Sequence, residues 1–87
     1  MLLEVLTPDK KIFSGEVTSV SVPGTSGAFQ VLNNHAPIIS TLESGKVTIK
    51  EHSNTHVYEI NGGVIEVLKN KVVVLVESLI SSNTNNN

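Results

Sequence analysis

The chain has 87 residues, a net charge of −2 and no cysteine, which excludes disulfides and zinc sites with thiolate ligands. All six basic residues are scattered lysines, which argues against nucleic acid as a partner because phosphate neutralisation needs clustered Lys and Arg. No apolar stretch approaches the roughly 18 residues of a membrane-spanning helix, and no signal-peptide pattern precedes Leu2. We therefore expect one small, soluble domain inside a cell.

The apolar residues recur at a spacing of two or in continuous runs, and turn residues interrupt the chain at short intervals, which predicts an all-β sandwich or barrel. The expected strands are residues 2–6, 11–13, 16–22, 28–31, 38–42, 46–50, 56–60, 64–68 and 71–77. The expected breaks are Pro8-Asp9, Ser14-Gly15, Pro23-Gly24, Ser44-Gly45, Ser53-Asn54, Asn61-Gly62-Gly63 and Lys69-Asn70. Among these, Asn61-Gly62 is a strong signal for a β-hairpin.

The last apolar run, residues 72–76, is apolar on both faces of a strand. Val72, Val74 and Val76 can fill the interior, which leaves Val73 and Leu75 on the opposite side. Two interpretations stay open: the protein's own loops cover these two side chains, or a partner covers them.

From Ser81 the sequence contains only Ser, Thr and Asn. A segment of this composition cannot bury apolar surface. We therefore expect a β-sandwich domain at residues 1–79 and a disordered polar tail at residues 80–87.

No residue set in this sequence carries evident chemistry. His52 and His56 flank a turn, but with His35 distant and no third ligand evident we expect no metal site. The acidic residues are dispersed, and a catalytic pair among them is not excluded by sequence alone, although surface positions explain them better. The Gly-rich segments at 23–27 and 61–63 are not followed by a helix that could bind phosphate, so we interpret them as turns. We expect no enzyme activity, no cofactor and no small-molecule substrate.

The most informative segment is the polar loop that contains Asn34, His35, Ala36 and Pro37, set between two apolar runs. Loops displayed by a rigid scaffold commonly carry contact residues. This loop also belongs to an ordered set of stretches that covers most of the chain: residues 7–17, 22–27, 32–39, 62–67 and 70–75. In that order and at that spacing, they resemble the N-terminal β-sandwich of the epsilon subunit of F-type ATP synthases, which is called delta in mitochondria.

The resemblance implies a two-sheet β-sandwich of about ten short, mostly antiparallel strands. It also implies a non-catalytic rotor subunit at the foot of the central stalk, which couples proton or sodium passage to ATP synthesis. The implied partners are the gamma subunit and the c-ring. The implied location is the cytoplasmic side of the bacterial plasma membrane, where such a subunit is peripheral through its complex and not itself inserted.

Residues that match family positions facing gamma are Thr7, Asn34, His35, Ala36, Pro37 and Ser40. Residues that match the end facing the c-ring are Ser26, Gly27, Ala28 and Phe29. Many relatives carry an acidic residue where Ala28 stands, and because this sequence departs from that pattern we expect a backbone or apolar contact here in place of a charge-assisted one.

Many members of the family continue into an inhibitory helical hairpin that in some cases binds ATP. No Ala/Leu/Arg-rich helical segment is present in this sequence, so it is either a short form without a C-terminal helical domain and that regulation, which we favour, or a piece of a longer protein. The alternative function is a free-standing β-sandwich that binds a ligand or peptide by strand addition at an exposed edge.

Overall fold

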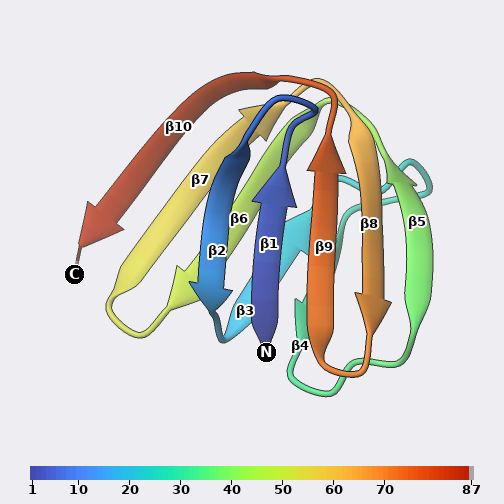
Figure 1. The fold of residues 1–87 in the computed structure, drawn as a ribbon, viewed down its shortest axis with the longest axis vertical. Coiled ribbons are helices and arrows are strands. Elements are labelled where there is room, and N and C mark those ends of the chain that lie inside the picture. Colours follow the sequence, from blue (N-terminus) through green and yellow to red (C-terminus); the bar gives the residue numbers. More distant parts are fainter. Residues whose placement is uncertain (87) are drawn as a thin grey trace.

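The computed structural model describes residues 1–86, which form ten strands and no helix. Five strands form each of two sheets that face one another (Figure 1). The first sheet has the order β2-β1-β9-β8-β5, and the second has the order β10-β7-β6-β3-β4. The strands are β1 (Leu2–Leu6), β2 (Lys11–Glu16), β3 (Ser19–Val22), β4 (Phe29–Leu32), β5 (Ile38–Leu42), β6 (Gly45–Glu51), β7 (Asn54–Ile60), β8 (Gly63–Leu68), β9 (Lys71–Val76) and β10 (Leu79–Asn86). The predicted two-sheet β-sandwich is confirmed.

Most neighbouring strands are antiparallel, and β1 with β9 is the parallel pair among the described strands. Tight turns fix the register of the hairpins. Between β8 and β9 the two turn residues are Lys69 and Asn70, both with positive φ (51° and 60°), as a two-residue hairpin turn of the favoured hand requires. The expected break at this position is therefore a hairpin turn.

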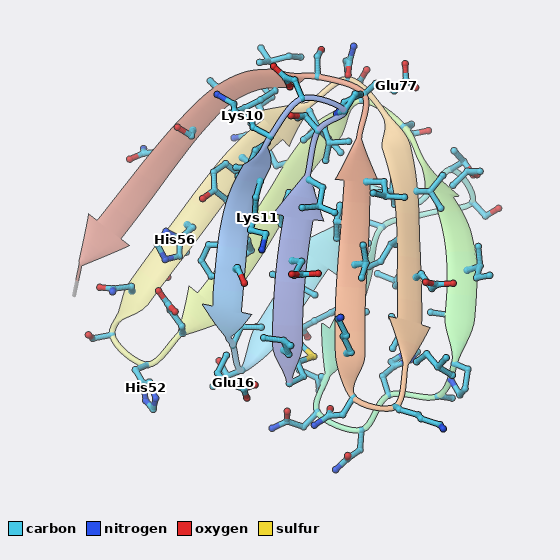
Figure 2. All side chains as sticks on the ribbon, in the orientation of Figure 1. Lys10, Lys11, Glu16, His52, His56 and Glu77 are labelled. Carbon is cyan, nitrogen blue, oxygen red and sulfur yellow. The ribbon has the colours of Figure 1, made fainter. Side chains whose placement is uncertain are left out.

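The loops gather at the two ends of the sandwich. Figure 2 shows Lys10 and Glu77 at one end, and Glu16 and His52 at the other. We call the first the Lys10 end and the second the His52 end. The direction of each strand decides which loops meet at an end, and residues distant in sequence share an end for that reason.

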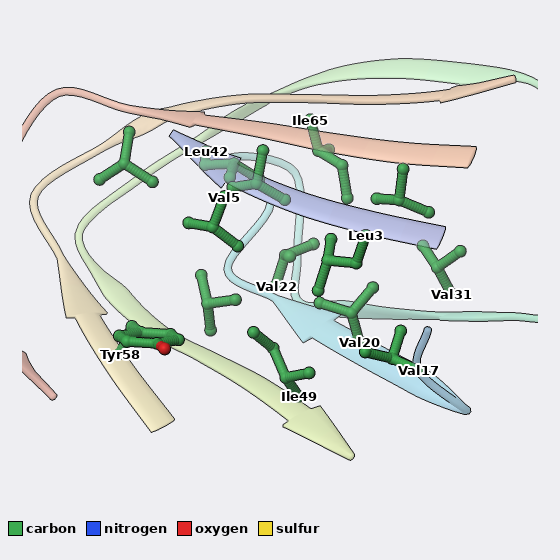
Figure 3. Packing of buried hydrophobic residues seen from close by; sticks show 14 of the residues in the cluster. Leu3, Val5, Val17, Val20, Val22, Val31, Leu42, Ile49, Tyr58 and Ile65 are labelled. Atoms are coloured by element: carbon green, nitrogen blue, oxygen red, sulfur yellow. The ribbon is translucent and has the colours of Figure 1, made fainter. Parts of the chain in front are cut away.

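The core lies between the sheets and consists almost entirely of Val, Ile and Leu. In β9 the alternation is complete: Val72 and Val74 are inaccessible to solvent and Val76 is 3% exposed, as predicted. In the first sheet Leu3 is fully buried, and it points across the interior toward Val20 of the second sheet (Figure 3). Burying each such side chain contributes about 1.5–3 kcal/mol relative to exposure, so the two inner faces hold the sandwich together.

One expected strand, residues 16–22, is wrong. β2 continues through Ser14 and Gly15 to Glu16, because these residues pair with β1. The chain then leaves the first sheet, and β3 begins at Ser19 in the second sheet. Val17 donates its backbone N–H to the Met1 carbonyl at 2.9 Å, and Thr18 donates to the Lys50 carbonyl at 2.8 Å. Adjacent residues thus bond to opposite sheets, and the strand cannot be continuous.

The hairpin predicted at Asn61-Gly62 is also wrong. β7 ends in the second sheet and β8 begins in the first, so the two strands are not paired. The segment instead crosses between the sheets beside a second crossing, from β9 to β10. The Asn61 side chain accepts a hydrogen bond from the Ser78 N–H at 2.8 Å, and the Glu77 N–H donates to the Gly62 carbonyl at 3.1 Å. The two crossings therefore stabilise each other.

The structure differs from the disordered tail expected at residues 80–87. Residues 80–86 belong to β10, which pairs antiparallel with β7, while position 87 lies outside the described residues. The polar composition fits an edge strand, because a strand can bond its backbone to a neighbour without burying apolar side chains.

Candidate functional site

The outward side of the first sheet carries a broad apolar surface, which we call the outer face. Because side chains alternate along a strand, every residue of β1, β9, β8 and β5 that is not directed into the core points to this side. The registers align these residues in rows across the sheet. One row contains Leu6, Leu75, Val64 and Thr41, the next contains Glu4, Val73, Glu66 and Ile39, and the third contains Leu2, Lys71 and Leu68.

Large apolar side chains on the outer face are open to solvent. Ile39 is 72% exposed, Leu68 52% and Leu75 50%. Val73 is half-buried by its neighbours in the sheet. No loop within the described residues covers these positions, so the first of the two interpretations for Val73 and Leu75 is wrong for Leu75. A contiguous apolar surface of this kind marks an interaction site.

The outer face deepens into a groove of about 600 Å³ toward the Lys10 end. Leu6, Val64 and Leu75 form its apolar floor, and Thr7 and Pro8 border it. A second hollow, of about 360 Å³, lies at the β5–β8 edge between Pro37, Ile39 and Leu68. These two hollows allow a partner to fit the outer face by shape complementarity.

Ionic groups on the outer face differ in how they are paired. The Glu4 carboxylate lies 3.4 Å from the Lys11 ammonium and 3.8 Å from that of Lys71. Both lysines are about half exposed, so each pair contributes less than about 1 kcal/mol. Glu66, in the same row, has no ion pair within the part of the chain described.

Thr7 lies at the Lys10 end of the outer face. Its hydroxyl donates to the Asp9 carboxylate at 2.7 Å, and its backbone N–H donates to the Lys10 carbonyl at 2.9 Å. The hydrogen bond from Thr7 lowers the pKa of Asp9 below its ordinary value. This turn therefore presents a fixed carboxylate and the Pro8 ring beside the groove.

The loop containing Asn34, His35, Ala36 and Pro37 lies at the opposite, His52 end, close to the β8–β9 turn. The Asn34 N–H donates to the Asn70 side-chain oxygen at 2.8 Å, and the His35 N–H donates to the Leu32 carbonyl at 3.2 Å. The His35 ring places Nδ1 at 2.7 Å from the Ala36 carbonyl oxygen. The loop is thus ordered by its own hydrogen bonds and by those to Asn70.

Ser40 is directed away from the outer face. It pairs with the buried Ile65 across the β5–β8 ladder, so its side chain points to the core side, near the sheet edge. Its neighbour Ile39 takes the outward position instead. The residues expected to face gamma are therefore not one patch: Thr7 and the His35 loop lie at opposite ends, and the outer face connects them.

The residues expected to face the c-ring lie in the β3–β4 connection and at the first position of β4, at the Lys10 end. Ser26, Gly27 and Ala28 are exposed, while Phe29 is half-buried. The loop closes through a hydrogen bond from the Gly27 N–H to the Gly24 carbonyl at 3.0 Å. Thr25 ties it to the first sheet, because the Thr25 N–H donates to the Thr41 carbonyl and the two hydroxyls lie 2.7 Å apart. These contacts close the loop and join its base to the first sheet.

The described residues hold no group of three or more His, Cys, Asp or Glu side chains placed to share a metal ion. His52 lies in the β6–β7 turn, and His56 lies on β7 (Figure 2). The His56 Nε2 lies 2.7 Å from the Glu51 carboxylate. The centroids of the His56 and Phe13 rings lie 5.1 Å apart. Burial, and secondarily the Glu51 charge, raise the pKa of Tyr58 on the same strand. This cluster joins β2 to β7 at the side of the sandwich.

Residues 1–86 contain no helix of the length and apolarity needed to cross a membrane.

Comparison with known proteins adds findings from sequence and from structure. Residues 1–82 match the model of the β-sandwich domain of the ATP synthase delta/epsilon chain. The ATP synthase epsilon chain of Chlorobium limicola is 44% identical over 78 residues, which cover 88% of this chain and 89% of that one. The epsilon chain of Caulobacter vibrioides is 41% identical over 78 residues, which cover 90% of this chain and 91% of that one.

Other relatives are longer. The epsilon chain of Maridesulfovibrio salexigens is 44% identical over 77 residues, and this chain spans about half of its length, 54%. Among solved structures, a chain in the cryo-EM structure of the Euglena gracilis mitochondrial ATP synthase with OSCP, F1 and c-ring has a TM-score of 0.83 at 21% identity, with 90% of this chain and 51% of that one covered. A chain of the Tetrahymena thermophila central stalk and c-ring has a TM-score of 0.75 at 17% identity, with 92% and 65% covered. At these identities the structural likeness bears on the fold alone.

Proposed function

Because the chain belongs to the family of ATP synthase delta/epsilon β-sandwich domains, we propose that it is a non-catalytic rotor subunit of the central stalk of an F-type ATP synthase. In this role it binds the gamma subunit and the c-ring, and it transmits ion-driven rotation to ATP synthesis. It acts from the cytoplasmic side of a bacterial membrane, as a peripheral member of the complex. The observation that carries the gamma contact is the exposed apolar outer face in a member of this family.

Gamma binds the outer face, with Thr7 and the His35 loop as its two ends. The support is physical: Ile39, Leu68 and Leu75 are each at least half exposed and lie on one surface of a rigid sheet. Burying such side chains in an interface stabilises a complex at roughly 25 cal/mol per Å² of apolar surface, before the cost of association. A rotor also needs a permanent contact, and apolar interfaces are typical of permanent complexes.

The c-ring contacts the Lys10 end through Ser26, Gly27, Ala28 and Phe29. This tip has no charged side chain, and it offers exposed backbone, a methyl group and part of a phenyl ring. The hydrogen bonds from Thr25 to Thr41 join this loop to the first sheet, so that a force on the loop is passed to the sandwich. The support for this assignment is the family position of the loop and its hydrogen bonds to the first sheet.

A second candidate function is strand addition at an exposed edge, as in a free-standing binding module. β10 leaves one side of its backbone without a partner strand in the described fold. Among the edge strands β2, β5, β10 and β4, we take β10 as the candidate for this function, because it belongs to the sheet that does not form the outer face. The two candidates therefore predict different sensitive residues.

A binding experiment with the purified gamma subunit of the same organism distinguishes these functions. Ile39→Asp on the outer face should weaken gamma binding at least about tenfold, because a carboxylate replaces a buried methyl surface. Ile80→Asp is the matched control, since Ile80 is also exposed (59%) but lies on β10. Equal affinity of the Ile39→Asp variant and the wild type contradicts the proposed gamma face. Absence of gamma binding by the wild type favours the free-standing edge-strand function instead.

A further inference from the structure

We propose that Glu66 selects the partner on the outer face, and that the contacting element of this partner carries an arginine or lysine between apolar side chains. The inference rests on the proposed function, which makes the partner the gamma subunit. It adds the chemistry by which that partner is recognised.

Glu66 lies in the middle of the outer face and is surrounded by apolar residues. Across the sheet it pairs with Val73 on one side and Ile39 on the other. Along β8 the neighbours on the same side are Val64 and Leu68, by the alternation of the strand. Glu66 also lines the hollow at the β5–β8 edge, together with Ile39 and Leu68. A partner that covers these apolar side chains must cover the carboxylate as well.

Glu4 provides an internal comparison. It occupies the same row as Glu66, separated from it by Val73. Two lysines within 4 Å compensate the charge of Glu4. Among the side chains that the structure describes, residues 1–83, none forms an ion pair or hydrogen bond with the carboxylate of Glu66. The protein therefore neutralises one carboxylate of this row and leaves the other exposed and uncompensated.

An uncompensated carboxylate decides which partners can bind. Covering the carboxylate with an apolar surface would remove its hydrating water and offer no hydrogen bond or charge in exchange. The desolvation of the charge would then cost a large amount of binding free energy. A second copy of the chain would bring a second Glu66 to the same apolar surface, which adds like-charge repulsion. A partner cation placed opposite Glu66 removes the penalty and forms a charge-assisted hydrogen bond. The face thus excludes unrelated apolar surfaces and favours a basic residue flanked by apolar ones.

Among basic residues, arginine suits this position best. Its guanidinium is planar and more weakly hydrated than the lysine ammonium, so it gives up less hydration free energy when it is transferred to an apolar surface. It can also stack its plane on Ile39 or Val73 while its N–H groups donate to the carboxylate.

The test measures binding of the purified gamma subunit of the same organism to four forms of the full chain, at low and at high NaCl. The forms are the wild type, Glu66→Gln, Glu66→Lys and the control Glu59→Gln, which removes one charge from an exposed position on β7 of the other sheet. We expect Glu66→Gln to weaken binding about tenfold or more at low salt, and Glu66→Lys to weaken it further. The salt dependence of the affinity should be smaller for Glu66→Gln than for the wild type, and Glu59→Gln should stay within about twofold.

A charge-reversal screen completes the test. Lys→Glu and Arg→Glu variants of gamma are tested against the Glu66→Lys chain, and one of them should restore binding. The inference is overturned if Glu66→Gln binds gamma as tightly as the wild type, or if Glu59→Gln weakens binding equally. It is also overturned if Glu66→Gln self-associates while its affinity for gamma is unchanged, because Glu66 would then only guard the face against aggregation. If the wild type itself does not bind gamma, the proposed function fails.

Discussion

The Asn70 side-chain oxygen accepts a hydrogen bond from the backbone N–H of Asn34 at 2.8 Å, although the two residues are 36 positions apart. This bond joins the β8–β9 turn to the loop that carries His35. Asn70 is suited to this role because it also takes the positive φ of 60° that the hairpin turn requires. One residue thus closes a hairpin and fixes one end of the proposed gamma surface.

Asn70→Gly should mobilise the His35 loop, because glycine keeps the turn conformation but removes the acceptor. Faster amide hydrogen exchange at residues 33–37 is the expected result, with a loss of about 1 kcal/mol in the free energy of unfolding. Asn70→Asp is the control, since it keeps an acceptor oxygen and should protect the loop. Unchanged exchange at Asn34 in the glycine variant would show that other contacts order the loop.

Thr7→Val should raise the pKa of Asp9 toward its ordinary value of 3.8, because the hydroxyl that stabilises the carboxylate is lost. The folded-state pKa of Asp9 lies below the unfolded value, so the bond stabilises the fold above the unfolded pKa. That stabilisation is lost as the pH falls through the folded pKa. NMR titration of the Asp9 carboxyl carbon measures the change directly. Identical titration curves in both proteins would rule out the Thr7 hydroxyl as the cause.

Leu3→Ala should reduce the free energy of unfolding by about 2–5 kcal/mol, because Leu3 is completely buried between the sheets and its removal leaves a cavity. Leu68→Ala is the matched control on the outer face, where the side chain is 52% exposed. We expect that variant to stay within about 0.5 kcal/mol of the wild type. Urea denaturation measures both, and comparable losses would contradict the assignment of inner and outer faces.

Gly63→Ala should destabilise the start of β8. A Cβ at this position would lie 2.1 Å from the Leu75 carbonyl oxygen, so β8 and β9 would have to separate locally. A loss of about 1–3 kcal/mol is the expected cost of such overpacking. In Gly15→Ala the new methyl group would meet the Phe13 ring at 3.7 Å, an ordinary contact, and the stability should change little. Thermal unfolding of the two variants gives the comparison.

Sequence reasoning predicted the strands well where the periodicity is strict. The alternation of Val72, Val74 and Val76 with Val73 and Leu75 placed the first three in the core, and the structure confirms this. The same reasoning could not tell which face of Ile38–Leu42 is buried, because both faces of this strand carry apolar residues. The pairing with β8 decides which residues of this strand face the core, and it turns Ile39 outward and Ser40 inward. The assignment of Ser40 to the gamma-facing set comes from its match to a family position, whereas the outward position of Ile39 follows from the register with β8.

The errors elsewhere have a common physical origin in long-range pairing. Glu16–Val22 is an uninterrupted strand-like sequence, but Val17 bonds to Met1, which precedes β1 of the first sheet, and Thr18 bonds to Lys50 on β6 of the second sheet. Asn61-Gly62 is a strong local signal, yet it serves a crossing between sheets because β7 and β8 have other partners. Local sequence specifies where the chain turns, and the partner strands decide what the turn connects.

Site-directed cross-linking in assembled complexes tests the central proposal most directly. The chain has no cysteine, so Ile39→Cys, Ala28→Cys and Ile80→Cys each introduce a unique thiol for a short photoreactive reagent. In membranes of the same organism, the Ile39→Cys chain should form a covalent product with gamma and the Ala28→Cys chain a product with the c subunit, while the Ile80→Cys chain should form neither. A gamma product from Ile80→Cys but not from Ile39→Cys, or ATP synthase complexes that lack this chain, would contradict the account.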